Sequence, residues 1–203
     1  VGKNIGLIPL GFTEIWSASF NSAIIISAGD NAEFIAFCGI NLDITIFNKE
    51  NVYLPAFLKT YPFLNVEVEN KDKKVNSLIA IDNNPKYVAK DKKIFILDKE
   101  KNLSKQVATK VELIKELNSQ RAVCRRIIAE LKKLDLLIKK DLRVKIEGKE
   151  EKVILEEFYV INMEKLLKLD DKIIAGFARK GWMGIFDAHL KSISNFEKIL
   201  KAN

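Results

Sequence analysis

The stretch that decides the fold closes the chain, from Phe158 to Leu200: FYVINMEKLLKLDDKIIAGFARKGWMGIFDAHLKSISNFEKIL. Near its end, apolar or aromatic side chains and the only histidine recur at steps of four and three residues, at Trp182, Phe186, His189, Ile193, Phe196 and Leu200. Residues at this spacing lie on one face of a helix. The sequence therefore predicts a closing helix whose apolar face must be covered by the rest of the protein.

A second helix is expected just before it. Asp170 and Asp171 are typical helix-capping residues, and they precede an apolar set at Ile173, Ile174 and Phe177. Gly181 is well placed to end this helix, because glycine adopts the left-handed conformation common after a last helical turn. The two segments together predict a C-terminal helical pair.

The first hundred residues are rich in short β-branched and aromatic runs separated by turn residues, which predicts strands. LNVEVE and SLIAI are expected to pair with each other across a charged loop. The runs are AIIIS at 23–27, EFIAFCGI at 33–40, LDITIF at 42–47, LNVEVE at 64–69, SLIAI at 77–81 and IFIL at 94–97.

The pattern changes to helical spacing from Leu103 to about Ile138, with Ser104 as a candidate cap. LRVKIEGKEEKVILEEFYVI then alternates around Gly148 and predicts a β-hairpin, after which Asn162 is expected to cap a short helix through Leu169. The expected fold is a single α+β domain over residues 1–203, with a strand-rich part at 1–100. In it, a mainly antiparallel sheet packs against a long central helix and the C-terminal helical pair.

The net charge of +7 comes from 34 basic and 27 acidic residues, and the lysines alternate with acidic residues. Such mixed-charge segments are typical of solvated loops, so we expect no specific nucleic-acid binding. No apolar run reaches the roughly 18 residues of a transmembrane helix. The sequence shows no signal peptide, so we expect a cytoplasmic protein. It also starts without methionine, as a chain with upstream residues removed would, so the cell surface is the alternative.

His189 is the main candidate for chemistry, yet it has no second histidine or nearby cysteine cluster to complete a metal site. We therefore expect no metal and no cofactor. A buried structural histidine, packed against Trp182, Phe186 and Ile193 with Phe196 close by, is the preferred interpretation. The alternative is an enzyme of unknown reaction that uses a pocket near Asp82 and His189.

Cys38 and Cys124 lie far apart in apolar runs, which favours two buried free thiols over a disulfide or a nucleophile. Arg121 falls on the apolar seam of the central helix between Leu117 and Cys124. Its guanidinium is expected to reach solvent or to pair with a carboxylate at the edge of the core. A role in anchoring a ligand is the alternative.

Aromatic residues crowd the segment YLPAFLKTYPF, where a short helical element is expected between two prolines. The four rings cannot all pack inward from so short an element, and exposed aromatic side chains are typical of interfaces. The candidate binding residues are Tyr53, Pro55, Phe57, Tyr61 and Phe63. The alternative is that they plug one end of the sheet.

Five segments, in this order, resemble motifs of the SapC family of bacterial proteins, named for a member associated with the surface layer. The resemblance covers nearly the whole chain. The segments are YLPAFLKTYPF, LIAIDNNP, RAVCRRIIAELKKLDLL, EEFYVINMEKLLKLDD and GWMGIFDAHLKSISNF.

The resemblance implies an accessory or binding protein in surface-layer protein biogenesis or secretion, acting through a protein partner rather than as an enzyme. The sequence departs from the family pattern at Lys59 and Thr60, where the family has two arginines. It departs again at Asn83 and Asn84, where the family has an acidic pair. If those residues carry a shared activity, this chain lacks that activity or performs it differently. The oligomeric state is left open.

Overall fold

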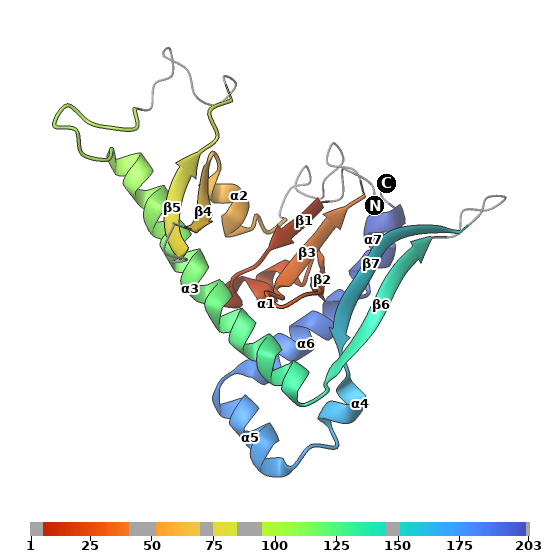
Figure 1. Cartoon of the computed structure of the whole chain (residues 1–203). Helices are drawn as coiled ribbons and strands as arrows, with labels where there is room; N and C mark the ends of the chain where they lie inside the picture. The colour runs from red at the N-terminus through yellow and green to blue at the C-terminus, as the bar shows by residue number, and fades with distance from the viewer. Residues whose placement is uncertain (1–5, 41–51, 70–74, 85–94, 145–150, 202–203) are drawn as a thin grey trace. The chain divides into compact units, whose positions relative to one another are not determined.

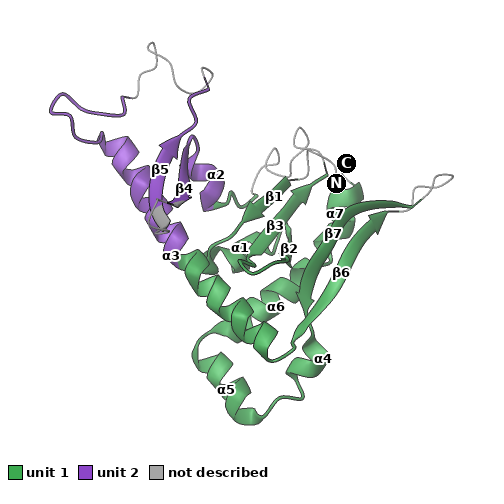
Figure 2. Cartoon of the chain, in the orientation of Figure 1, with its two compact units in different colours: residues 1–55, 120–203 green, residues 56–119 purple. Residues whose placement is uncertain are grey.

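The structure is a computed structural model that describes residues 6–40, 52–69, 75–84, 95–144 and 151–201 (Figure 1). The chain divides into two compact units: Val1–Pro55 with Gln120–Asn203, and Ala56–Ser119 (Figure 2). Each unit is described by itself below. The predicted strand at 42–47 and the predicted hairpin turn around Gly148 lie outside the described residues.

The larger unit is built on a five-stranded sheet in the order β1-β3-β2-β7-β6, with every neighbouring pair antiparallel. β2 pairs with β7 at Ile26 and Tyr159, which brings the N-terminal strands and the later hairpin into one sheet (Figure 1). This confirms the predicted α+β fold with a mainly antiparallel sheet. The strands are β1 (Gly6–Pro9), β2 (Ala23–Ile26), β3 (Phe34–Gly39), β6 (Leu137–Val144) and β7 (Lys152–Ile161).

The C-terminal helices α5 (Asp171–Arg179), α6 (Trp182–Ser192) and α7 (Asn195–Lys201) belong to this unit. Phe196 of α7 lies 5.1 Å from Phe37 of β3 and 5.8 Å from Phe158 of β7, measured between ring centroids. The four side chains of β2 are all buried, which agrees with a continuous apolar run in the middle of a covered sheet.

The predicted helix over Trp182–Leu200 is interrupted after Ser192. Ser192 Oγ donates to the carbonyl of His189 at 2.6 Å, and this kind of bond competes with regular helical geometry. The buried amide of Asn195 then donates to the carbonyls of Ser19 at 2.7 Å and Ser22 at 3.0 Å. These contacts fix where α7 begins.

The predicted caps are confirmed. The Asp170 side chain accepts the Lys172 N–H at 2.8 Å at the start of α5, and Gly181 has a φ of 71° after it. Asn162 caps α4 (Met163–Leu166) by accepting the Lys165 N–H at 3.1 Å, although this helix ends before Leu169.

The long central helix α3 spans Lys105–Lys133, 29 residues, and contains the boundary between the two units. The prediction that it continues to about Ile138 is wrong. Asp135 has a φ of 52°, which ends the helical geometry, and Leu137 and Ile138 open β6 instead. β-branched Ile138 fits a strand better than a helix end.

The smaller unit holds α2 (Ala56–Thr60), the antiparallel pair β4 (Phe63–Glu69) and β5 (Val75–Ile81), and the first part of α3. This confirms the predicted pairing of LNVEVE with SLIAI. Phe63, Val107 and Ile114 form its buried cluster. The predicted strand IFIL is wrong for Phe95–Leu97, where Leu97 makes only an isolated bridge to Leu103.

Candidate functional site

His189 lies on α6 and is completely buried, as predicted. Its Nε2 accepts the backbone N–H of Ile161 at 3.2 Å, at the end of β7. Its ring meets Phe34 edge to face, with 6.0 Å between centroids. The histidine therefore joins the helix to two strands of the sheet, as a structural residue would.

The protonation of His189 follows from these contacts. Because Nε2 is an acceptor, the proton of the neutral ring is on Nδ1. Nδ1 is buried and forms no well-aligned hydrogen bond with a described residue. Burial lowers the pKa of His189 to about 4, against a smaller opposing effect of the Ile24 backbone. The ring is neutral at physiological pH.

Replacing His189 by alanine is expected to lower the free energy of unfolding by about 1–3 kcal/mol, because a packed ring and the acceptor of the Ile161 N–H are lost together. Chemical denaturation of both proteins measures the difference. A variant that unfolds like the parent but loses its biological activity would contradict the structural role.

Asp82, the second catalytic candidate, follows β5 in the smaller unit. The Tyr61 hydroxyl donates to one carboxylate oxygen, and the Asn84 N–H donates to the other at 3.0 Å. These two bonds, that of Tyr61 first, hold the pKa of Asp82 below its usual range. The carboxylate thus organises a turn. Asp82 and His189 belong to different units, and a pocket that combines them stays a prediction.

The candidate binding residues of the aromatic segment are buried or partly buried. The Tyr53 hydroxyl donates to Glu14 Oε1 at 2.9 Å within the larger unit, and burial, followed by the Glu14 charge, raises the pKa of Tyr53. Pro55 is buried, and Phe57 and Tyr61 are half-buried. Phe63 is in the core cluster of the smaller unit. A binding role for these five residues stays a prediction.

The departures from the family pattern have clear places in the smaller unit. Thr60 is buried, and its hydroxyl donates to the Phe57 carbonyl at 2.9 Å. The carbonyl of exposed Lys59 accepts Lys110 Nζ at 2.6 Å, and Lys110 also donates to the Tyr61 carbonyl at 3.0 Å. Burial lowers the pKa of Lys110. Exposed Asn83 and Asn84 follow Asp82 in its turn.

Arg121 pairs with a carboxylate at the edge of the core, as predicted, and the partner is Glu33 just before β3. Arg121 Nη2 donates to both oxygens of Glu33, at 2.9 and 2.8 Å, and Nε donates at 3.2 Å. Arg125 Nη1 lies 3.3 Å from the same carboxylate. Two arginines of α3 therefore pair with one glutamate whose side chain is only 11% exposed.

Cys38 and Cys124 are buried free thiols, as predicted. Burial raises the pKa of each to about 12, so neither is a thiolate at neutral pH. The described residues also hold no group of three or more side chains that could bind a metal ion. Every described helix is too short or too polar to cross a lipid bilayer.

An exposed aromatic pair was not identified from the sequence. Trp16 in α1 (Ile15–Ala18) is 48% exposed and Phe20 is 51% exposed, with 6.1 Å between their ring centroids. Lys191 Nζ of α6 lies 4.6 Å from the Phe20 ring and 6.0 Å from the Trp16 ring. The i, i+4 spacing of Trp16 and Phe20 was the available signal. We call these three residues the Trp16 patch.

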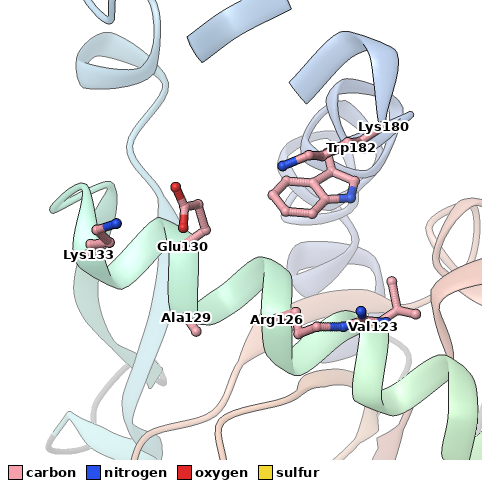
Figure 3. Close-up of a pocket in the computed structure, with 7 residues that line it drawn as sticks. All are labelled: Val123, Arg126, Ala129, Glu130, Lys133, Lys180 and Trp182. Carbon is pink, nitrogen blue, oxygen red and sulfur yellow. The ribbon is translucent and has the colours of Figure 1, made fainter. Parts of the chain in front are cut away.

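A groove of about 710 Å³ opens in the larger unit beside the second half of α3 (Figure 3). The start of α6 faces it with Trp182, and Lys180 precedes that helix. We call it the Trp182 groove, and its lining residues are Val123, Arg126, Ala129, Glu130, Lys133, Lys180 and Trp182. No local sequence pattern marks this groove, because two distant segments form its walls.

Comparison with known proteins gives one result. The model of the SapC family matches residues 1–199 of the 203-residue chain. Neither a curated protein nor a solved structure matches the chain.

Proposed function

Because the chain belongs to the SapC family, we propose that it is a non-enzymatic accessory protein of surface-layer protein biogenesis or secretion that acts by binding a protein partner. Membership of the SapC family supports the proposed role in surface-layer protein biogenesis or secretion. The binding role is supported by the surface of the larger unit, where two large aromatic side chains are each about half exposed.

The Trp16 patch is the observation that carries the proposal. Trp16 and Phe20 are each about half exposed, whereas other large side chains such as Phe34 and Phe186 are fully buried. Truncating tryptophan at protein interfaces has large effects because a rigid ring removes much water from the partner surface. Lys191 Nζ lies over both rings, and these cation–π contacts favour one arrangement of the rings before a partner binds.

Replacing both Trp16 and Phe20 by alanine is expected to weaken partner binding at least about 30-fold, because even one interface anchor contributes about 2 kcal/mol and the effects of neighbouring anchors do not add fully. The measurement is cross-linking of the tagged protein in its own cells, followed by quantification of the cell's surface-layer protein in the product. Phe95→Ala is the matched control, since Phe95 is 69% exposed in the other unit.

Equal cross-linking of the double variant and the control would remove the Trp16 patch as the interface. A gene deletion that leaves the amount of surface-layer protein unchanged would contradict the proposed process. Fractionation of the same cells tests the expected cytoplasmic location against the cell surface.

A further inference from the structure

The Trp182 groove has an uncompensated positive charge. Three cations line it, Arg126, Lys133 and Lys180, against the single carboxylate of Glu130. Among the described residues, none of these four side chains forms an ion pair or a hydrogen bond. The neighbouring Arg125 pairs with Glu33, whereas Arg126 and Lys133 on the groove side of α3 have no described carboxylate partner.

The groove also has an apolar wall that is held in place. The Trp182 ring stacks on Phe177 with 5.5 Å between centroids, and Lys180 Nζ lies 4.5 Å from the same ring. Val123 and the small side chain of Ala129 supply the apolar part of the α3 side (Figure 3). A ligand therefore meets cations and the indole ring of Trp182 together.

The spacing of the cations favours an extended chain over a small anion. Arg126 and Lys133 are seven residues apart on α3, which places them about 10 Å apart along the helix axis. One phosphate or carboxylate group would have to draw both long side chains toward it, whereas separate carboxylates can meet each cation where it lies. In an extended peptide, side chains on one face recur about every 7 Å, so acidic side chains two or four positions apart cover the span.

We propose that the Trp182 groove binds an acidic segment of a protein partner, with its carboxylates on Arg126, Lys133 and Lys180 and an apolar side chain against Trp182. This inference rests on the proposed protein-binding function. The net charge of +7 attracts an acidic partner, and charge complementarity sets which segment is accepted. Glu130 repels an unbroken acidic run, so the segment carries an uncharged or basic residue opposite it.

Trp182 can report binding directly, because the chain has only two tryptophans. In a Trp16→Phe background, Trp182 is the only tryptophan, and its fluorescence is followed during titration. The probe is a short synthetic peptide with glutamates four positions apart, glutamine midway between them and leucine at the remaining positions, and the control peptide has glutamine in place of glutamate. We expect the acidic peptide to change Trp182 emission at concentrations where the glutamine peptide does not.

The charge contacts are tested by variants in the same background. Lys133→Ala and Lys180→Ala are each expected to weaken binding of the acidic peptide about 10-fold, the effect of one charge-assisted contact. Glu130→Gln is expected to tighten it. Lys168→Ala and Lys172→Ala remove the same charge from exposed lysines outside the groove, and we expect a change of less than about twofold from this screened long-range effect.

Three outcomes overturn the inference: equal binding of the glutamine peptide, equal effects of the groove and control lysines, or displacement of the peptide by inorganic phosphate at a similar concentration. The last would identify a site for small anions. Because this titration uses no natural partner, its failure is separate from failure of the cross-linking test. If the acidic peptide does not bind while cross-linking to the partner is unchanged, the inference about the Trp182 groove is wrong and the proposed function is unaffected.

Discussion

Replacing Glu33 by alanine is expected to lower the free energy of unfolding by about 3 kcal/mol, the low end of the cost of breaking a buried ion pair. Glu33 accepts two bonds from Arg121 Nη2 and one from its Nε, and it also pairs with Arg125. The variant leaves both guanidinium groups without their carboxylate. Because the Arg121 and Arg125 side chains keep 21% and 34% of their surface exposed, water offsets part of the loss.

Urea denaturation measures this effect, and the melting temperature should fall by about 6–12 °C for a chain of this size. Glu157→Ala is the matched control, since Glu157 pairs with Lys139 at 2.6 Å where both side chains are more than half exposed. Exposed pairs contribute about 0–1 kcal/mol. If the two variants lose the same stability, the Glu33 cluster does not stabilise the fold as described.

As the pH drops from about 7 to 4, protonation of His189 in the unfolded chain is expected to lower the free energy of unfolding by about 3 kcal/mol. Burial lowers the pKa of His189 from 6.5 to about 4 in the folded protein. Between these values the unfolded chain binds a proton that the folded protein excludes, so stability rises with pH across this window. The contribution becomes constant above about pH 7.5, one unit above the pKa in the unfolded chain, and each unit of pKa difference corresponds to about 1.4 kcal/mol.

The chain has one histidine, so the slope between about pH 5.5 and pH 6.5 isolates this residue from the carboxylates that titrate below it. Urea denaturation at several pH values gives the slope. The control is His189→Gln, which keeps a hydrogen-bonding side chain but does not titrate. The same slope in the parent and in this variant would show that His189 is not the origin.

Local signals in the sequence were sufficient for much of the fold. Asp170, Asn162 and Gly181 act within a few residues of themselves, so the helix boundaries they set were predicted and confirmed. The end of α3 was not, because Leu137 and Ile138 continue an apolar pattern that suits a helix or a strand. Pairing with β7 decides between the two, and it involves residues more than twenty positions away.

The candidate site was harder to predict because its contacts are long-range. Arg121 could be placed at the edge of the core from its own helix, but Glu33 is 88 residues away and nothing local marks it as the partner. The same holds for the Trp182 groove, whose walls come from α3 and from the start of α6. The burial of His189 was predicted from its helical face, whereas its bond to Ile161 depends on how β7 ends.

The adjacent residues Arg125 and Arg126 have unequal freedom to change during evolution. Arg125 is tied to Glu33, so a substitution there costs stability, whereas Arg126 contributes to no described ion pair. Lys133 also forms no described ion pair. The proposed preference of the Trp182 groove for a particular acidic segment can therefore change among descendants of this chain while the fold is conserved. Relatives that recognise different partners are then expected to keep the carboxylate at position 33 and to vary at positions 126 and 133.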